Sequence, residues 1–118
     1  MTQHLAFFPA QEEQHTLNLL RYLMPHPEST FFFRAQSNAL QASGIVKEGL
    51  LVVDRTLTPH SGQVVVAYLR DEFVVRRLII RHNKGYLEAD DPRYRTIQLT
   101  DAEDSLIWGV VTWVLHRP

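Results

Sequence analysis

The spacing of apolar residues identifies one helical segment near the start of the chain. In "PAQEEQHTLNLLRYLMPHP", Leu17, Leu20 and Met24 recur at helical spacing, and Pro25 closes the segment. The pattern predicts one amphipathic helix over roughly residues 11–23.

After this helix the apolar residues alternate or occur in short blocks, which is typical of β-strands. Turn sequences such as "TPHSG" at 58–62 and "HNKG" at 82–85 separate the blocks, and short connections favour antiparallel hairpins. We therefore predict a mainly β fold of antiparallel strands with one N-terminal helix. The predicted strands are STFFFRA, LLVVD, QVVVAYL, EFVVRRLII, GYLEA, TIQL and SLIWGVVTWVLH.

Composition narrows the class of protein. A length of 118 residues with 45% hydrophobic content suits one domain, which we place at 11–118 after an arm at 1–10. The net charge of -1 provides no basic excess to hold nucleic acid. The chain has no cysteine, no secretion signal and no run of ~20 apolar residues, so we expect a cytoplasmic protein that does not enter membranes.

Titratable side chains give little sign of a metal or cofactor site. The six histidines are scattered without metal-ligand spacing, and the acidic groups "DAED" and "DD" lie in turn-like polar segments. We expect neither a metal nor a cofactor. In "EFVVRRL", Arg76 and Arg77 are neighbours on a strand, so one of them should face the unsolvated side of the sheet. A charge there needs a partner, an edge position or a functional site.

Several ordered segments together resemble a known family. "QSNAL", "GIVKEGLLVVD", "GQVVVA" and "EFVVRRL", followed by "EADDPRYRTIQL" and "DSLIWGVVTWVLH", resemble in sequence and order the LexA and UmuD family of self-cleaving serine peptidases. The resemblance is strongest to the UmuD branch and covers roughly residues 8–116. It implies the LexA/signal-peptidase-like β fold.

The family's chemistry uses a serine nucleophile and a neutral lysine as general base. In this chain the nucleophile position falls on Ala39 and the lysine position on Arg76. Alanine has no hydroxyl, and arginine keeps its proton at cellular pH, so either residue alone should abolish the dyad. An engineered serine-to-alanine change would account for Ala39 but not for Arg76.

An alternative keeps the chain an active self-cleaving peptidase. Ser37 or Ser43 would then act as nucleophile, with Lys47 as a candidate base. Lys47 is expected to lie in the turn before a strand, where solvent keeps an amine protonated. Shifting the alignment to Ser37 would also leave Arg76 or Arg77 where the family has lysine.

The resemblance also suggests partners. No Ala-Gly or Cys-Gly bond, the type that the family cleaves, precedes the predicted helix, and the chain starts close to where processed UmuD would start. Processed UmuD forms a homodimer that associates with an error-prone translesion polymerase subunit in the SOS response to DNA damage. We expect a non-catalytic subunit of that kind, as a homodimer or as a mixed dimer with an active UmuD paralogue. The RecA filament is a further candidate partner.

Two other expectations concern surfaces. About 38 residues precede Ala39, too few for the repressors' helix-turn-helix domain, so sequence-specific DNA binding is not expected. The closing apolar run supplies the candidate interface residues Trp108, Val110, Trp113 and Leu115. A further alternative is a protein of a mobile element that interferes with host SOS components through the same surface.

Overall fold

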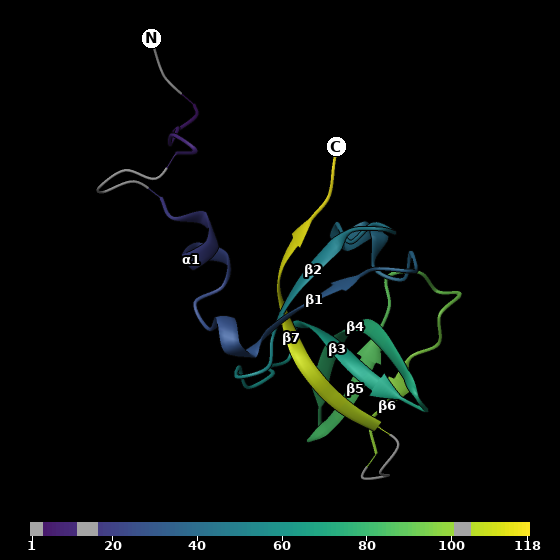
Figure 1. Cartoon of the computed structure of the whole chain (residues 1–118). Coiled ribbons are helices and arrows are strands. Elements are labelled where there is room, and N and C mark those ends of the chain that lie inside the picture. The colour runs from purple at the N-terminus through teal and green to yellow at the C-terminus, as the bar shows by residue number, and fades with distance from the viewer. Residues whose placement is uncertain (1–3, 12–16, 101–104) are drawn as a thin grey trace.

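The fold is built on an antiparallel β-sheet. The computed structural model describes residues 4–11, 17–100 and 105–118 (Figure 1). Within these residues the strands are β1 (Thr30–Arg34), β2 (Leu50–Asp54), β3 (Val64–Leu69), β4 (Glu72–Arg81), β5 (Lys84–Glu88), β6 (Ile97–Gln98) and β7 (Ser105–Leu115). They form a seven-stranded sheet in the order β1-β2-β7-β3-β4-β5-β6, and every neighbouring pair is antiparallel. The predicted mainly β, antiparallel fold is confirmed.

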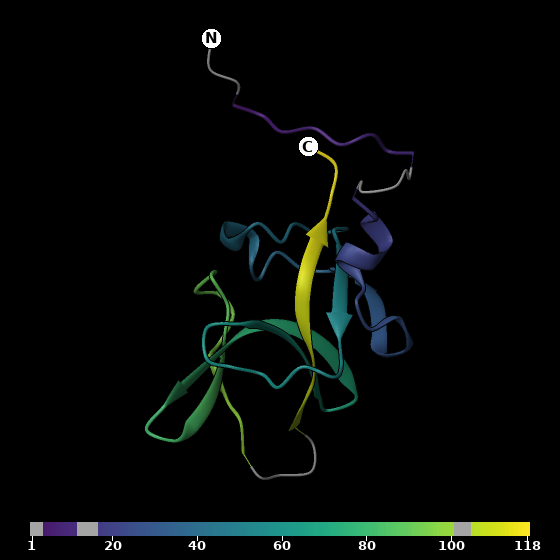
Figure 2. The same ribbon diagram turned by 90° about the vertical axis from the view of Figure 1, so that its left-hand side faces the viewer.

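Strand β7 joins the two halves of the sheet. Its C-terminal part pairs with β2, from Val110 to Leu115, and its N-terminal part pairs with β3, from Ser105 to Val110. The register shifts once against each neighbour, between Val52 and Val53 on β2 and between Val66 and Ala67 on β3. β7, in yellow, therefore runs between the β1–β2 end and the β3–β6 end of a curved sheet (Figure 2).

The N-terminal helix is shorter than predicted. Helix α1 covers Leu19–Leu23, whereas the sequence predicted roughly 11–23. Residue 11 and residues 17–18 are not helical, and 12–16 lie outside the described residues. The Asn18 side chain accepts a hydrogen bond from the Arg21 backbone N–H, which caps the helix start at Leu19. None of the residues of α1 is buried, so no packed apolar face extends the helix.

The core lies along the sheet in two clusters. One contains Leu40, Leu51 and Val53, together with the half-buried Phe33 and Trp108. The other joins β3, β4 and β5 through Val65, Ala67, Leu78 and Leu87, with Val110 from β7. On β3 the clusters lie on opposite faces, because Val66 belongs to the first cluster and its neighbours Val65 and Ala67 belong to the second.

Residues 4–11 have no regular secondary structure and lie clear of the sheet in both views (Figure 1, Figure 2). Among the described residues, no helix has the length and apolar character needed to cross a membrane.

Candidate functional site

Ala39 is held in the loop that connects β1 to the short 3-10 helix Gln41–Ser43. Its exposed fraction is 0%, and its backbone carbonyl accepts hydrogen bonds from the N–H groups of Asp90 and Asp91, at 2.8 and 3.4 Å. Its own N–H donates to the Ser37 hydroxyl at 3.4 Å. The position predicted to correspond to the family's nucleophile is therefore fixed from both sides, by the loop itself and by the segment after β5.

Arg76 is the strand arginine that turns inward. It is only 8% exposed, and its Nη1 donates to the Val75 carbonyl at 2.7 Å. The guanidinium carbon lies 5.1 Å from the centre of the Tyr94 ring, within cation–π range. Burial lowers the pKa of Arg76, while Tyr94 and Glu72 oppose that shift. A guanidinium still remains protonated at neutral pH, so Arg76 cannot accept a proton as a general base.

One turn contacts both of these positions. Asp90 bonds to Ala39, and Tyr94 covers Arg76. The turn between them is closed by the Tyr94 N–H, which donates to the Asp91 carbonyl at 3.0 Å, and Arg93 pairs with the Asp91 carboxylate at 2.7 Å. Ala39 and Arg76 are thus brought to the same turn, although they lie 37 positions apart in the numbering of the chain.

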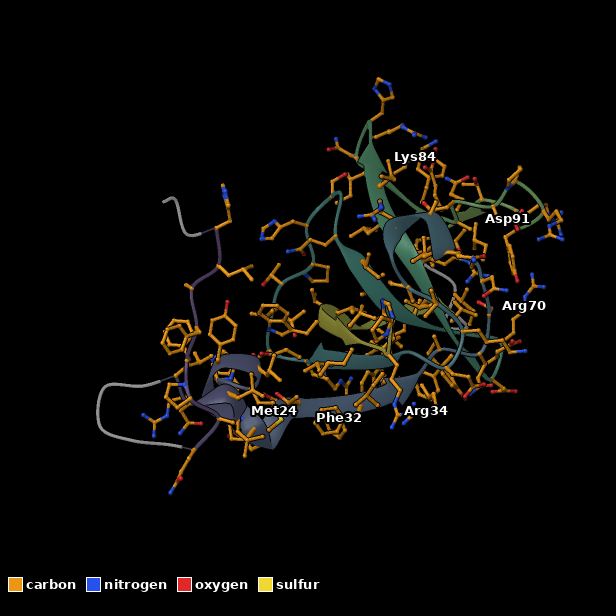
Figure 3. The ribbon with its side chains drawn as sticks, turned by 90° about the horizontal axis from the view of Figure 1, so that it is seen from above. Met24, Phe32, Arg34, Arg70, Lys84 and Asp91 are labelled. Atoms are coloured by element: carbon orange, nitrogen blue, oxygen red, sulfur yellow. The ribbon has the colours of Figure 1, made fainter. Side chains whose placement is uncertain are left out.

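Arg76 also lines a groove of about 740 Å³ between the β3–β4 turn and β6. Its basic lining residues are Arg70, Arg76 and Arg95, and Glu72 is the acidic one. Arg70 and Asp91 mark this side of the molecule, opposite Met24, which follows α1 (Figure 3). Ala39 does not line the groove, so the groove lies beside Arg76 and not beside the predicted nucleophile position.

The two alternative nucleophiles have other partners. The Ser43 hydroxyl donates to the Asp90 carboxylate at 2.7 Å and accepts from Arg77 Nη2 at 3.0 Å. The Ser37 hydroxyl accepts the Ala39 N–H. Lys47 is exposed and lies beside a different groove, near Arg34 and His116. Within the described residues, no hydrogen bond joins Lys47 to either serine.

Sequence reasoning missed the role of Asp90. The "DD" pair was predicted to be solvated charge in a turn, yet Asp90 binds both the backbone N–H and the hydroxyl of Ser43, at 2.8 and 2.7 Å. This contact ties the turn after β5 to the loop that carries Ala39. Small residues in that loop and an Asp-Asp-Pro turn were both visible in the sequence, but only tertiary structure brings them together.

A second polar network was also missed. The Asp54 carboxylate, at the end of β2, is 3% exposed and lies 2.7 Å from His26 Nδ1. It also accepts from the backbone N–H and the hydroxyl of Thr56, at 2.8 and 2.6 Å. Burial alone would raise the pKa of Asp54, but these hydrogen bonds outweigh burial, and the pKa lies below its ordinary value. The network anchors the segment before β1 to the end of β2.

The four candidate interface residues differ in exposure. Val110 is 2% exposed and belongs to the core, so it offers no surface to a partner. Trp108 is half-buried, and Phe31, Phe33 and Phe73 pack around it. Trp113 and Leu115 are exposed, and Trp113 packs against Tyr22 of α1. Exposed apolar surface in this group is therefore confined to the C-terminal end of β7.

Known proteins match most of this chain. Protein ImpA of Salmonella typhimurium is 40% identical over 103 residues, which cover 86% of this chain and 68% of ImpA. Protein MucA of Escherichia coli is 39% identical over 107 residues, covering 88% of this chain and 72% of MucA. The LexA repressor of Ectopseudomonas mendocina is 32% identical over 93 residues, covering 78% of this chain and 46% of the repressor.

The family profile described as Peptidase S24-like matches residues 5–112, a span that includes the Ala39 loop, the Arg76 strand and the turn that contacts both. The chain therefore belongs to the Peptidase S24-like family, which includes the LexA-like and UmuD-like proteins that its sequence resembles.

Proposed function

We propose that this protein is a non-catalytic, UmuD′-like subunit of the SOS response to DNA damage. It would form a dimer in the cytoplasm and modulate an error-prone translesion polymerase, without sequence-specific DNA binding of its own. Similarity to ImpA and MucA over more than four-fifths of the chain supports placement in the UmuD branch. The observation that supports the loss of catalysis is that Ala39 and Arg76 stand at the two positions that the family resemblance assigns to the dyad.

The chemical reason is that two groups are affected, the nucleophile that gives up a proton and the base that accepts it. A peptidase of this kind needs an oxygen nucleophile and a base that can be neutral near the working pH. The side chain of Ala39 ends at its Cβ, and Arg76 is a permanent cation. The nearby hydroxyl of Ser43 donates to Asp90 and accepts from the cation Arg77, and neither of these partners is an amine that could take its proton as a general base.

Cleavage of a second chain provides the sharpest test of the proposed loss of catalysis. The substrate would be a UmuD paralogue with an intact arm and its own nucleophile replaced by alanine. We expect intact-mass measurements to find both chains uncut after prolonged incubation at alkaline pH or with activated RecA filament. An active UmuD paralogue serves as the positive control. Cleavage of the substrate, or of this chain near residues 5–12, would overturn the proposal.

Dimerisation has its own structural support at β7. Among the described residues, the stretch from Val111 to Leu115 pairs with β2 on one side and with no strand on its other side. An unpaired strand edge with exposed apolar side chains favours pairing with another chain. Trp113 and Leu115 supply such side chains, so a second subunit could extend the sheet there.

A mixed dimer is the more specific form of the proposal. A subunit that cannot be cleaved could still offer an active UmuD paralogue its dimer surface. Co-expression of the two chains, followed by mass measurement under native conditions, is expected to yield a species with one copy of each. If only the two separate homodimers form, the mixed dimer is excluded.

A further inference from the structure

The groove beside Arg76 has an unusual balance of charge. Of its described lining residues, Arg70, Arg76 and Arg95 are basic and Glu72 alone is acidic, although the whole chain has a net charge of -1. Arg70 and Arg95 are exposed, whereas Arg76 is almost fully buried. The groove therefore combines two cations at its surface with one at its base, and this arrangement attracts an anion.

The Arg76 guanidinium has unused hydrogen-bonding capacity. Its Nη1 donates to the Val75 carbonyl, and its Nε is buried without a partner in the described part of the chain. A buried donor without an acceptor is unfavourable, and structures of folded proteins contain few of them. Nε and Nη2 form the edge of a guanidinium that binds both oxygens of a carboxylate at once. Because less than 1 Å² of Nε is accessible, the Arg76 side chain would turn slightly toward the groove, where a carboxylate would supply the missing acceptor.

The remaining walls favour a peptide as the carrier of that carboxylate. Leu69, Val74 and Ile97 contribute apolar surface beside the arginines. β6, whose Ile97 and Gln98 both line the groove, is the last strand of the described sheet, where its one neighbour is β5. An extended peptide can bind to such an edge through its backbone while its side chains enter the neighbouring groove. The volume also lies within the usual range for a binding pocket.

We propose that this groove binds an extended, acidic peptide segment of a partner protein, with Arg76 pairing with a carboxylate and β6 pairing with the peptide backbone. Arg70 and Arg95 would add attraction at the entrance. The site goes beyond the proposed role in the SOS response and does not depend on it. It differs from the dimer surface, because the groove lies across the molecule from α1, against which Trp113 packs (Figure 3).

Two matched peptides test the carboxylate directly. One is a fluorescein-labelled, capped pentapeptide of alternating valine and glutamate, and the other has glutamine in place of each glutamate. In fluorescence anisotropy at about 50 mM salt, where screening is weak, we expect the glutamate peptide to bind at least about tenfold more tightly. Equal affinity of the two peptides, or no binding of either at millimolar protein, would overturn the proposal.

Matched arginine variants locate the binding. Arg76→Gln is expected to reduce affinity for the glutamate peptide at least about tenfold, and Arg76→Lys, which keeps the charge but loses the two-pronged geometry, at least about threefold. Arg81→Gln removes the same charge from the same strand outside the groove, where Arg81 pairs with Glu88, and should change affinity less than twofold. An equal loss in Arg76→Gln and Arg81→Gln would show charge attraction without a site and would contradict the proposal.

Arg76 is buried, so its variants need a safeguard against misfolding. The exposed pair Arg70→Gln and Arg95→Gln alters the groove at the surface and should weaken binding at least about threefold. In the unaltered protein, the NMR signal of the Arg76 Nε–H group should shift when the glutamate peptide is added and stay in place with the glutamine peptide. Unchanged affinity in the exposed pair together with an unmoved Nε–H signal would rule the site out.

Discussion

Asp54 shows what a single buried carboxylate contributes to this fold. Its side chain, 3% exposed, links His26 before β1 to Thr56 after β2. The hydrogen bonds that Asp54 accepts hold its pKa below the ordinary value despite burial. In the unfolded chain that pKa returns to about 3.9. The carboxylate therefore stabilises the folded protein above that pH, and its contribution is lost as pH falls through the folded-state pKa.

The variant Asp54→Asn tests this contribution. We expect the free energy of unfolding in urea to fall by about 1–3 kcal/mol at pH 7, since a buried, charged acceptor is replaced by a neutral amide that cannot accept all of its hydrogen bonds. As the pH falls from about 3.9 through the lower folded-state pKa, the difference from the unaltered protein should shrink, because Asp54 becomes protonated in both folded and unfolded states.

Asp71→Asn is the matched control for that measurement. Asp71 is exposed in the β3–β4 turn at a positive φ of 67°, a conformation that asparagine also adopts readily. Its effect should stay within about 0.5 kcal/mol at either pH. A pH-independent loss in Asp54→Asn would show that the residue acts through packing and not through its charge.

The sequence showed which residues stand at the two positions assigned to the dyad, but it said less about the residues that contact them. The alternation in "EFVVRRL" predicted that one arginine faces inward, and Arg76 does so, whereas Arg77 bonds to Gly62 and Ser43. The sequence could not predict that the turn after β5 contacts both Ala39 and Arg76. Asp90 reaches Ala39, and Tyr94 reaches Arg76, only through tertiary contacts. Their roles as dyad positions remain an interpretation from the family resemblance.

At the scale of elements, the strands and the presence of one N-terminal helix were predictable, but the length of that helix was not. Each predicted strand is present, because alternating apolar residues and turn sequences mark strands locally. The helix prediction relied on spaced leucines, but Leu19 and Leu20 are 56% and 67% exposed. Spacing alone does not stabilise a helix in water, since a short helix depends on tertiary packing of its apolar face.

The close packing of β7 against β2 places a strict size limit on one residue. A Cβ on Gly109 would lie 2.6 Å from Val53 Cγ1, closer than van der Waals contact allows. Val53 is fully buried and is β-branched, so it has little freedom to move aside. Glycine at 109 therefore permits the close approach of these two strands where their register shifts.

A double-mutant cycle tests the fit between Gly109 and Val53. Gly109→Ala should lower the free energy of unfolding by about 1–3 kcal/mol through overpacking, and Val53→Ala by about 2 kcal/mol through a cavity. In the double variant the new methyl occupies space that Val53 vacated. We expect its loss, measured by urea unfolding, to be smaller than the sum of the two single losses by at least about 0.5 kcal/mol.

Gly85→Ala provides the comparison for that cycle. A Cβ there would lie 3.1 Å from the end of the Leu99 side chain, which is half-buried and can turn away. Its cost should be smaller than that of Gly109→Ala. Strict additivity of the Gly109 and Val53 changes would mean that relaxation elsewhere, and not the contact between them, determines the cost.

At the scale of the whole molecule, the order of strands depends on contacts that no local pattern encodes. β7 inserts between β2 and β3, which follow each other in the chain, so the sheet closes only when the last strand is placed. Hairpins such as β3–β4 and β4–β5 could be read from short turns, but this insertion could not. Within the described parts of the chain, the same insertion leaves one edge of the C-terminal half of β7 unpaired, which the sequence alone did not reveal.

That edge leads to a prediction about assembly. If two subunits pair along the C-terminal half of β7, a lysine at position 115 would place two like charges in an apolar contact and oppose pairing. Leu115→Lys should therefore raise the dissociation constant of the proposed homodimer at least about tenfold, as measured by analytical ultracentrifugation over a series of concentrations. Leu106→Lys introduces the same change on the same strand, at an exposed leucine in the half that pairs with β3, and should leave the constant within about threefold. Equal weakening by both variants would move the dimer surface away from this end of β7, and a protein that stays monomeric throughout would remove the homodimer itself.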